Sequence, residues 1–539
     1  MASSSSHIEP RAAYWIVRSN APNARIPGTA SRWIVGNGVV TGVACYRTLA
    51  AGTTVRSLND RAAGIVSSLS GRARPASPFP PKGAPNVRAS LAALLLPLFH
   101  ALPACVDAAP DPRQPAVPDT VRAFVGVDVI PMDSERVIED QIVVVEDGRI
   151  VSIGPTAATT LPEDAIEIDG RGKFLIPGLA EMHGHIPPPD APAFHVESVL
   201  FLYVANGVTT VRGMLGYPGQ LELKERAARG EIVAPNLYLA GPSFSGQSIG
   251  SPEQADARVR EQAAQGWDLL KVHPGLTVEE YDAMAGAAAE TGMRFGGHVP
   301  EAVGLRHAIE MGQETIDHID GYEAELHTFE GPLDERYLAE IVELSREAGV
   351  WVIPTQVLWE TLYGTADLDS LRNLPELRYA PPAQVRQWIS IHEERLAQPD
   401  FDLGESRRLI AARMRILEAL HDGGVKILMG TDAPQQFSVP GFSLHREVKR
   451  MVQAGMSPFE VLVTGTRNVG EYFANEDDFG TVEPGKRADL VLLGENPLED
   501  IGNVDSIEGV MVAGRWLPRA EIDRRLQEIA AGYAGQPLE

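Results

Sequence analysis

Cysteine is almost absent from this sequence. Only Cys45 and Cys105 occur among its 539 residues. Two cysteines cannot build a disulfide framework or a thiolate metal site. A metal bound by this chain would therefore be held by histidine, by carboxylate or by a modified lysine.

Basic residues are also few. Lys and Arg number 47 against 72 Asp and Glu, which gives a formal charge of −25. Residues 1–104 nevertheless hold eleven Lys or Arg and only Glu9 and Asp60 as acids, so the rest of the chain carries about −34. Nucleic acid and anionic lipid both require a basic surface, and we therefore expect neither as a partner of the acidic body.

The apolar run of the leader, Leu91–Phe99, is too short to span a bilayer as a mature helix. It follows Arg88 and precedes small residues, which is the order of regions in a signal peptide, so residues 87–105 are predicted to be one. Residues 102–105 resemble a bacterial lipobox, in which Cys105 becomes a lipid anchor. Ordinary cleavage after an ALPA or VDA segment is the alternative. Both interpretations predict a secreted or periplasmic protein of a bacterium.

Residues 1–86 fit poorly before such a signal, which should begin close to the first residue. A start of translation further along the chain is one explanation. A disordered extension or an Arg-rich, transit-like leader is another, because the segment is rich in Ser, Arg, Pro and Gly. We expect these residues to have no role in the fold, and we interpret residues 106–121 as a Pro-rich linker.

Both ends of the mature chain contain short alternating runs that are typical of antiparallel strands, for example 141–145 before the turn Asp147-Gly148 and 488–493 near the C-terminus. We expect residues 122–175 and 480–518 to fold together as a small β-sandwich domain. Residues 519–539 then form a C-terminal helix or tail.

Between these ends, apolar strand-like runs alternate with helical patterns over residues 176–479. Eight such alternations match the size of a TIM-like (β/α)8 barrel, an α/β fold whose active site lies at the carboxyl ends of the strands. The long stretch 359–405 after the seventh strand is expected to be a partly helical lid. The runs are residues 174–183, 207–213, 236–241, 269–273, 294–299, 314–319, 350–356 and 426–431.

Polar residues at the ends of these runs carry the chemistry. His183 and His185 stand at i and i+2 of an extended segment, where alternation points both imidazoles to one face and lets them hold one metal ion. Lys271 lies within the apolar run 269–273, where burial of an ammonium group is costly unless chemistry relieves it. His298, His318 and Asp432 end the fifth, sixth and eighth runs.

This set resembles the amidohydrolase superfamily, and the resemblance extends over nearly the whole mature chain to the segment 480–491. The motif Gly430–Pro434, which contains Asp432, is among its more specific parts. The resemblance implies two divalent ions bridged by a CO2-derived carbamate on Lys271. His, carboxylate and carbamate ligands suit Zn best and also accept Mn, Co or Fe. The resemblance further implies that Asp432 ligates the first metal and handles protons. The implied ligands are His183, His185, Lys271, His298, His318 and Asp432.

The resemblance implies a hydrolase in which metal-bound hydroxide attacks a carbonyl, with Asp432 as general base and then general acid. The closest group is prolidase-like, which suggests cleavage of an amide bond in a small molecule such as a dipeptide or an N-acyl amino acid. Hydrolysis of a cyclic amide, a lactone or an organophosphate ester is the alternative. A non-catalytic binding relative is a second alternative, although the complete ligand set argues against it.

Three residues are weaker candidates for substrate contacts. His273 lies two residues after Lys271 and faces the same way, so it contacts substrate or is structural. Arg212 ends the second run and suits a substrate carboxylate, whereas an internal salt bridge is the more common role. Tyr363 belongs to the expected lid. The sequence leaves a homo-oligomer as a possibility that no pattern tests.

Overall fold

The computed structural model describes residues 33–35, 38–40 and 120–535. The predicted signal peptide, the candidate lipid anchor Cys105 and nearly all of the linker lie outside the described residues. Within residues 1–86, β1 (Trp33–Val35) and β2 (Gly38–Val40) pair antiparallel as a two-stranded sheet, in a unit of the chain separate from the body. Among the described helices, none has the length and apolar character needed to cross a bilayer.

Strands from the two ends of the body belong to one hydrogen-bonded sheet. Its order is β18-β17-β16-β7-β3-β4-β5, with β6 also paired to β3. Alternate residues such as Phe124, Val143 and Leu490 form a core of their own. The N- and C-terminal segments therefore share a sheet, whereas the β-sandwich domain expected from them stays a prediction. The strands are β3 (Arg122–Val129), β4 (Ile138–Glu146), β5 (Arg149–Pro155), β6 (Ile166–Asp169), β7 (Phe174–Pro177), β16 (Leu490–Leu493), β17 (Ile507–Val512) and β18 (Arg515–Pro518).

Eight further strands are parallel and pair in chain order. They form a three-stranded sheet, β10-β9-β8, and a five-stranded sheet, β11-β12-β13-β14-β15. Parallel bridges Ala240–Leu269 and Phe244–Val272 join the two sheets on one side. The alternation of strand and helix predicted an α/β fold, and the structure confirms it. The strands are β8 (Leu179–Gly184), β9 (Val208–Gly213), β10 (Asn236–Leu239), β11 (Leu269–Val272), β12 (Arg294–Gly297), β13 (Thr315–Asp317), β14 (Trp351–Ile353) and β15 (Lys426–Ile427).

The first expected strand, residues 174–183, is in fact two. β7 pairs antiparallel with β16 in the terminal sheet, and β8 pairs parallel with β9. The break falls at Gly178, whose amide donates to the Asp489 carbonyl oxygen at 2.8 Å. The prediction was wrong because continuous apolar character is equally suited to either sheet, and only the pairing partners distinguish them.

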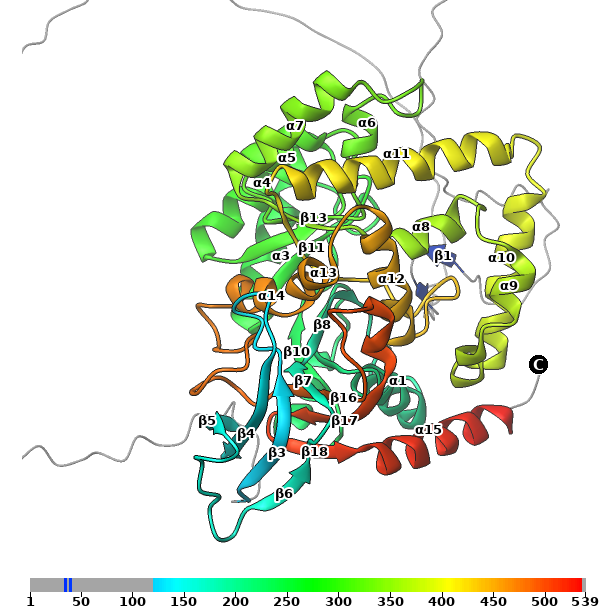
Figure 1. Ribbon diagram of the computed structural model, residues 1–539. Coiled ribbons are helices and arrows are strands. Elements are labelled where there is room, and N and C mark those ends of the chain that lie inside the picture. The colour runs from blue at the N-terminus through cyan, green and yellow to red at the C-terminus, as the bar shows by residue number, and fades with distance from the viewer. Residues whose placement is uncertain (1–32, 36–37, 41–119, 536–539) are drawn as a thin grey trace, which may run out of the picture. The chain divides into compact units, whose positions relative to one another are not determined.

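Helices alternate with the parallel strands, and local signals set their ends. Ser251 caps α3 before Pro252, and Thr277 with Glu280 forms a capping box on α4. Figure 1 shows α3 and α4 on the far side of the strands from α9 and α10. The helices outside the 359–405 stretch are α1 (Ala193–Ala205), α2 (Gln220–Ala228), α3 (Pro252–Gln265), α4 (Val278–Thr291), α5 (Leu305–Glu310), α6 (Tyr322–Glu325), α7 (Glu335–Ala348), α11 (Leu403–Asp422), α12 (Phe442–Gln453), α13 (Pro458–Gly465), α14 (Arg467–Tyr472) and α15 (Arg519–Ala534).

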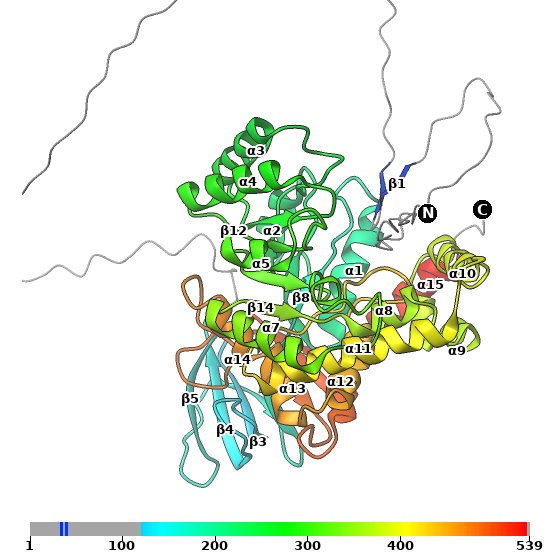
Figure 2. The same cartoon turned by 90° about the horizontal axis from the view of Figure 1, so that it is seen from above.

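The long stretch after β14 contains several short helices, and its role as a lid stays a prediction. It contains α8 (Gln356–Leu362), α9 (Leu368–Arg372), the 3-10 helix η1 (Pro375–Tyr379) and α10 (Pro382–Leu396). Figure 2 shows α8, α9 and α10 grouped on one side of the parallel strands. Trp388 of α10 packs on Phe437, which follows the eighth strand, with 5.9 Å between ring centroids. This insertion therefore covers the segment that follows Asp432.

Asp489 joins the terminal sheet to the parallel strands. Its carboxylate pairs with Arg487 at 2.6 Å and accepts hydrogen bonds from Asn236 of β10 and from the Ala513 amide. Removal of the carboxylate leaves the Asn236 amide and the Ala513 N–H without an acceptor, while Arg487 keeps its second partner, Asp477. We expect Asp489→Ala to lower the free energy of unfolding by about 1 to 3 kcal/mol, measured by chemical denaturation. The exposed Asp478, which pairs with Lys486, supplies the control. If Asp478→Ala destabilises as much as Asp489→Ala, the junction does not depend on Asp489.

Candidate metal centre

Three of the predicted ligands come together although they are far apart in the sequence. His183 lies on β8, His318 directly follows β13, and Asp432 follows β15. Their ligand atoms all lie within 4.8 Å of one another, and each side chain is buried. His318 Nε2 and His183 Nε2 are each 3.7 Å from a carboxylate oxygen of Asp432. This geometry suits a shared cation.

The other predicted ligands surround this group. The Nζ atom of Lys271 lies 3.1 Å from His183 Nε2, and His185 Nε2 lies 2.5 Å from Asp432 Oδ1. The His298 ring packs on that of His318, with centroids 4.5 Å apart. The structure therefore brings all six predicted ligands into one cluster at the carboxyl ends of the strands.

Each of three histidines uses its Nδ1 atom in a hydrogen bond and leaves Nε2 for the centre. His183 Nδ1 meets Asp317 at 2.6 Å, and His298 Nδ1 meets Asp320 at 2.6 Å. His318 Nδ1 meets the Thr355 hydroxyl at 2.9 Å. A carboxylate behind a ligand imidazole fixes the tautomer and raises ligand basicity. These three contacts are the arrangement that a metal-binding imidazole requires.

The centre contains buried polar atoms with no protein partner. Among the described residues, His298 Nε2 and His318 Nε2 are buried and make no hydrogen bond. An unpaired buried polar atom costs free energy and is uncommon in native proteins. Together with a carboxylate and a lysine, these free imidazole nitrogens form a donor set that fits divalent cations of the zinc type. The residues present therefore fit the metal that the ligand set implies.

Close backbone contacts position the ligands. A Cβ atom on Gly430 would lie 2.9 Å from the His183 amide nitrogen, and one on Gly297 would lie 2.9 Å from Lys271 Cδ. Only glycine allows the eighth strand to approach β8 this closely and leaves room for the Lys271 side chain. The small residues beside the ligands are thus part of the site.

Several strand ends adopt left-handed backbone conformations, with φ of 64° at His318, 47° at Thr355 and 63° at Asp432. Such conformations are costly for residues other than glycine and persist only where neighbouring contacts impose them. The fully buried Arg413 of α11 supplies two of these contacts, because its Nη2 atom donates to the carbonyl oxygens of His318 at 2.7 Å and Pro354 at 3.2 Å. The backbone turns that aim the ligands are therefore held from behind.

Burial sets the protonation of the cluster. It lowers the pKa of His183 and of His318 well below the usual histidine value, and nearby cations lower both further. Both imidazoles are therefore neutral at pH 7, which is the form that binds a metal. Burial also lowers the pKa of Lys271 to about 8. The carboxylates of Asp317 and Asp432 oppose this lowering of the Lys271 pKa, because their negative charges favour the ammonium form.

Arg212 is fully buried and forms the internal ion pair that the sequence left open. Its Nη2 atom donates to Asp317 at 3.1 Å, and Nε donates to the Met182 carbonyl oxygen at 2.7 Å. The Nη1 atom donates to the Thr315 and Tyr472 hydroxyls, both at 3.2 Å. With each nitrogen engaged, this guanidinium has no free face for a substrate carboxylate. The geometry favours a structural role over substrate binding.

The two other candidate substrate contacts differ from each other. His273 stacks on His298, with centroids 5.1 Å apart, and its Nε2 atom is buried without a partner among the described residues. It therefore has a hydrogen-bonding position to offer. Tyr363 is only 7% exposed and donates its hydroxyl to Glu323 at 3.0 Å. That hydroxyl is engaged with the protein, which leaves His273 as the better candidate.

Sequence reasoning did not find Asp317, Asp320 or Thr355. Asp317 directly precedes the predicted ligand His318, and Asp320 follows His318 by two residues. Acids on both sides of a predicted ligand were therefore a signal that the sequence offered. Thr355 carried no signal, because its approach to His318 depends on the register of two neighbouring strands. Glu181, which accepts bonds from the Thr431 amide and hydroxyl at 2.6 Å, was likewise absent from the prediction.

Comparison with known proteins identifies the family of this chain. The model of the family described as "Amidohydrolase family" matches residues 174–517. Adenine deaminase 3 of Rhizobium meliloti (strain 1021) is 23% identical over 405 residues, which cover 70% of this chain and 57% of that protein. The chain thus spans little more than half the length of the adenine deaminases that it matches.

Two solved structures share the fold. Bottromycin amidohydrolase superposes with a TM-score of 0.62 at 23% identity, over 78% of this chain and 92% of that one. A Xaa-Pro dipeptidase with methionine in its active site superposes with a TM-score of 0.57 at 21% identity, over 74% of this chain and all of that one. At these identities the likeness shows a common fold.

The Asp320–His298 contact generates a test of metal binding. We expect Asp320→Asn to weaken Zn²⁺ affinity by about 10- to 100-fold, because the imidazole loses the carboxylate that orients it. Affinity is measured by competition with a chelating dye, and circular dichroism monitors folding. Asp282→Asn is the matched control, since Asp282 holds His307 Nε2 at 2.7 Å on the protein surface. Equal Zn²⁺ affinity in the wild type and Asp320→Asn would show that His298 does not bind the metal.

Proposed function

The chain belongs to the amidohydrolase family, and from that premise we propose that it is a metal-dependent hydrolase that cleaves an amide carbon–nitrogen bond of a small molecule. One observation carries the proposal: His183, His318 and Asp432 converge within 4.8 Å beside a buried lysine. A non-catalytic relative would have no reason to keep unpaired imidazole nitrogens buried at this point.

The metal centre in this proposal is binuclear. His183, His185 and Asp432 would hold one divalent ion, His298 and His318 would hold the second, and carboxylated Lys271 would be a ligand of both. Zn suits the imidazole and carboxylate donors best. Two ions bound there would polarise the amide carbonyl and activate a water molecule. Addition of CO2 to the neutral amine of Lys271 would release a proton and leave a carbamate, whose carboxylate oxygens suit divalent cations.

The parallel strands, in this proposal, form one closed (β/α)8 barrel. The bridges between β10 and β11 join the two sheets on one side, and backbone hydrogen bonds from Met182 to Met429 and from Asp432 to His183, each 2.8 Å, join them on the other. The terminal sheet then corresponds to the small sandwich domain. All six ligands stand at one end of this barrel, where active sites of the fold lie.

In this proposal, side chains of the protein transfer the proton, orient the imidazoles and contact the substrate carbonyl. Asp432 accepts a proton from the attacking water and delivers it to the leaving nitrogen, since its carboxylate reaches both His185 and the centre of the cluster. Asp317, Asp320 and Thr355 hold three imidazoles in one tautomer. His273 offers its unpaired Nε2 atom to the substrate carbonyl or to the oxyanion that develops from it.

The substrate we propose is a dipeptide or an N-acyl amino acid. The fold shared with a Xaa-Pro dipeptidase and with bottromycin amidohydrolase supports an amide substrate. Secretion or a periplasmic location in a bacterium, with Cys105 as a candidate lipid anchor, belongs to the same proposal because it would suit the scavenging of peptides. The match to adenine deaminases makes adenine a necessary comparison substrate.

An assay of the purified protein with Zn²⁺ tests the proposal. The panel contains Xaa-Pro dipeptides, N-acyl amino acids, a lactone, a phosphotriester and adenine, with metal content measured on the same sample. We expect two metal equivalents and hydrolysis of an amide. Asp432→Asn should lower kcat by about 10²- to 10⁴-fold, since it removes the acid–base group.

Asp369→Asn is the control, because the Asp369 side chain is exposed on α9. Activity confined to the lactone or the phosphotriester would replace the amide by an ester as substrate. Release of ammonia from adenine alone would make the protein a deaminase. A metal-free protein that hydrolyses nothing would leave only a binding role.

A further inference from the structure

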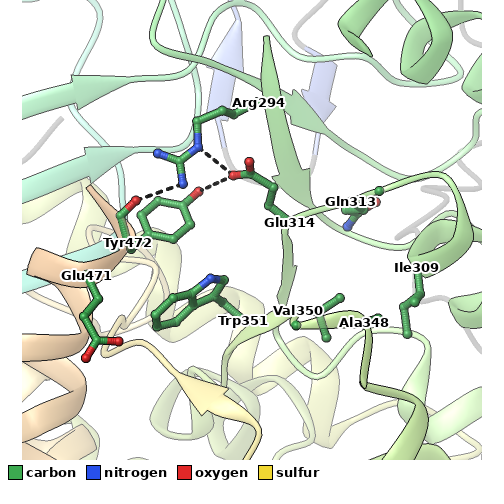
Figure 3. Close-up of a pocket in the computed structure, with 11 residues that line it drawn as sticks. Arg294, Ile309, Gln313, Glu314, Ala348, Val350, Trp351, Glu471 and Tyr472 are labelled. Carbon is green, nitrogen blue, oxygen red and sulfur yellow. Dashed lines mark hydrogen bonds and ion pairs between the residues drawn. The ribbon is translucent and has the colours of Figure 1, made fainter. Parts of the chain in front are cut away.

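Tyr472, the last residue of α14, stands at the opposite end of the parallel strands from the metal ligands. Its neighbours Arg294 and Trp351 begin β12 and β14, and Glu314 directly precedes β13. Figure 3 shows Tyr472 between Arg294 and Trp351, with its hydroxyl directed at Glu314. The tyrosine ring is 8% exposed. Nothing in the proposed chemistry assigns a role to this residue.

A continuous series of hydrogen bonds connects Tyr472 with the metal ligand His183. The Tyr472 hydroxyl accepts from Arg212 Nη1 at 3.2 Å. Arg212 Nη2 donates to Asp317 Oδ2 at 3.1 Å, and the same oxygen accepts from His183 Nδ1 at 2.6 Å. Every member of this series is buried, so water cannot replace a lost partner readily.

Charged groups hold Tyr472, the end of the series that lies away from the metal ligands. The Tyr472 hydroxyl donates to Glu314 Oε2 at 3.2 Å, and Arg294 Nε donates to the same oxygen at 2.7 Å (Figure 3). The Arg294 guanidinium also stacks on the tyrosine ring, 3.9 Å from its centroid. Because the hydroxyl donates its hydrogen to Glu314, its oxygen is left as the acceptor for Arg212. The tyrosine is thereby fixed both in position and in the direction of its hydrogen bonds.

We propose that Tyr472 is a positioning residue for the metal ligand His183, acting through Arg212 and Asp317 from the far ends of the strands. The inference rests on the proposed function in that His183 binds a metal. The hydroxyl holds Nη1 of Arg212, which keeps Nη2 directed at Asp317. Asp317 in turn sets the tautomer and the orientation of His183. Loss of the hydroxyl loosens the carboxylate behind the ligand without touching the metal site.

The first test measures Zn²⁺ affinity, which does not depend on the identity of the substrate. We expect Tyr472→Phe to weaken Zn²⁺ binding by about 3- to 10-fold, less than the roughly 10- to 100-fold for a residue that contacts the ligand directly. The absorption spectrum of the Co²⁺-loaded protein should change as well, because it reports ligand geometry. Glu471→Gln is the matched control: Glu471 is adjacent in sequence, lines the same cavity and pairs with Lys426, outside the series.

A double-mutant cycle tests the route. If Tyr472 acts through Asp317, the Tyr472→Phe substitution should change Zn²⁺ affinity by less than about twofold in an Asp317→Asn background, because coupled residues are not additive. Full additivity of the two effects would overturn the route. An unchanged affinity in Tyr472→Phe, or an equal loss in Glu471→Gln, would overturn the positioning role itself. A wild-type protein that binds no Zn²⁺ would instead overturn the proposed function.

The cavity beside Tyr472 permits a chemical rescue. It has a volume of about 260 Å³ and is lined by Tyr472, Trp351, Arg294 and Glu314 among others. Tyr472→Ala leaves the space of a phenol side chain beside this pocket, and cavities engineered by removal of a side chain accept small aromatic molecules. We expect p-cresol to restore Zn²⁺ affinity in Tyr472→Ala at least threefold more than toluene does. Equal effects of the two compounds would assign the role to packing of the ring and overturn the role of the hydroxyl.

Discussion

The hydrogen bond from the Asp432 amide to the His183 carbonyl oxygen, 2.8 Å long, joins the last parallel strand to the first. It is one of the backbone contacts that bring residues 249 positions apart in the sequence into one cluster. The geometry of the cluster depends on it, because the two residues it connects are themselves proposed ligands. Gly430 makes this approach possible, since any side chain there would strike the His183 backbone. The pairing of the two backbones thus positions the side chains that carry the proposed chemistry.

The cluster that this pairing creates is electrostatically demanding. Lys271, Asp317 and Asp432 are buried together, and isolated charges in such surroundings are unstable. Two fully buried arginines compensate part of the buried negative charge. Arg212 pairs with Asp317, and Arg413 pairs with Glu323. Both also donate to backbone carbonyl oxygens of ligand-bearing segments. The same groups that balance charge therefore hold the ligands in place, which explains why so many polar side chains are buried around one point.

Much of the proposed ligand set could be selected from the sequence because it depends on local signals. His183 and His185 are two residues apart on an extended run, Lys271 interrupts an apolar strand, and Asp432 lies in a glycine-containing motif. The supporting residues were not predictable in the same way. Thr355 reaches His318 only because β13 and β14 pair in a particular register. Tyr472 reaches Arg212 from a helix 260 residues further along the chain, a contact that no periodicity indicates.

The sequence by itself determined the order of strands and helices, the chemical type of the ligands and their place at strand ends, because apolar periodicity and short motifs express local preferences. Only the tertiary structure decided that residues 174–183 divide between two sheets. It also decided that Arg212 forms an internal ion pair and that the Tyr363 hydroxyl bonds to Glu323. Those outcomes depend on which distant segment completes a hydrogen bond. A buried polar group must find some partner, but its own sequence neighbourhood does not specify which one.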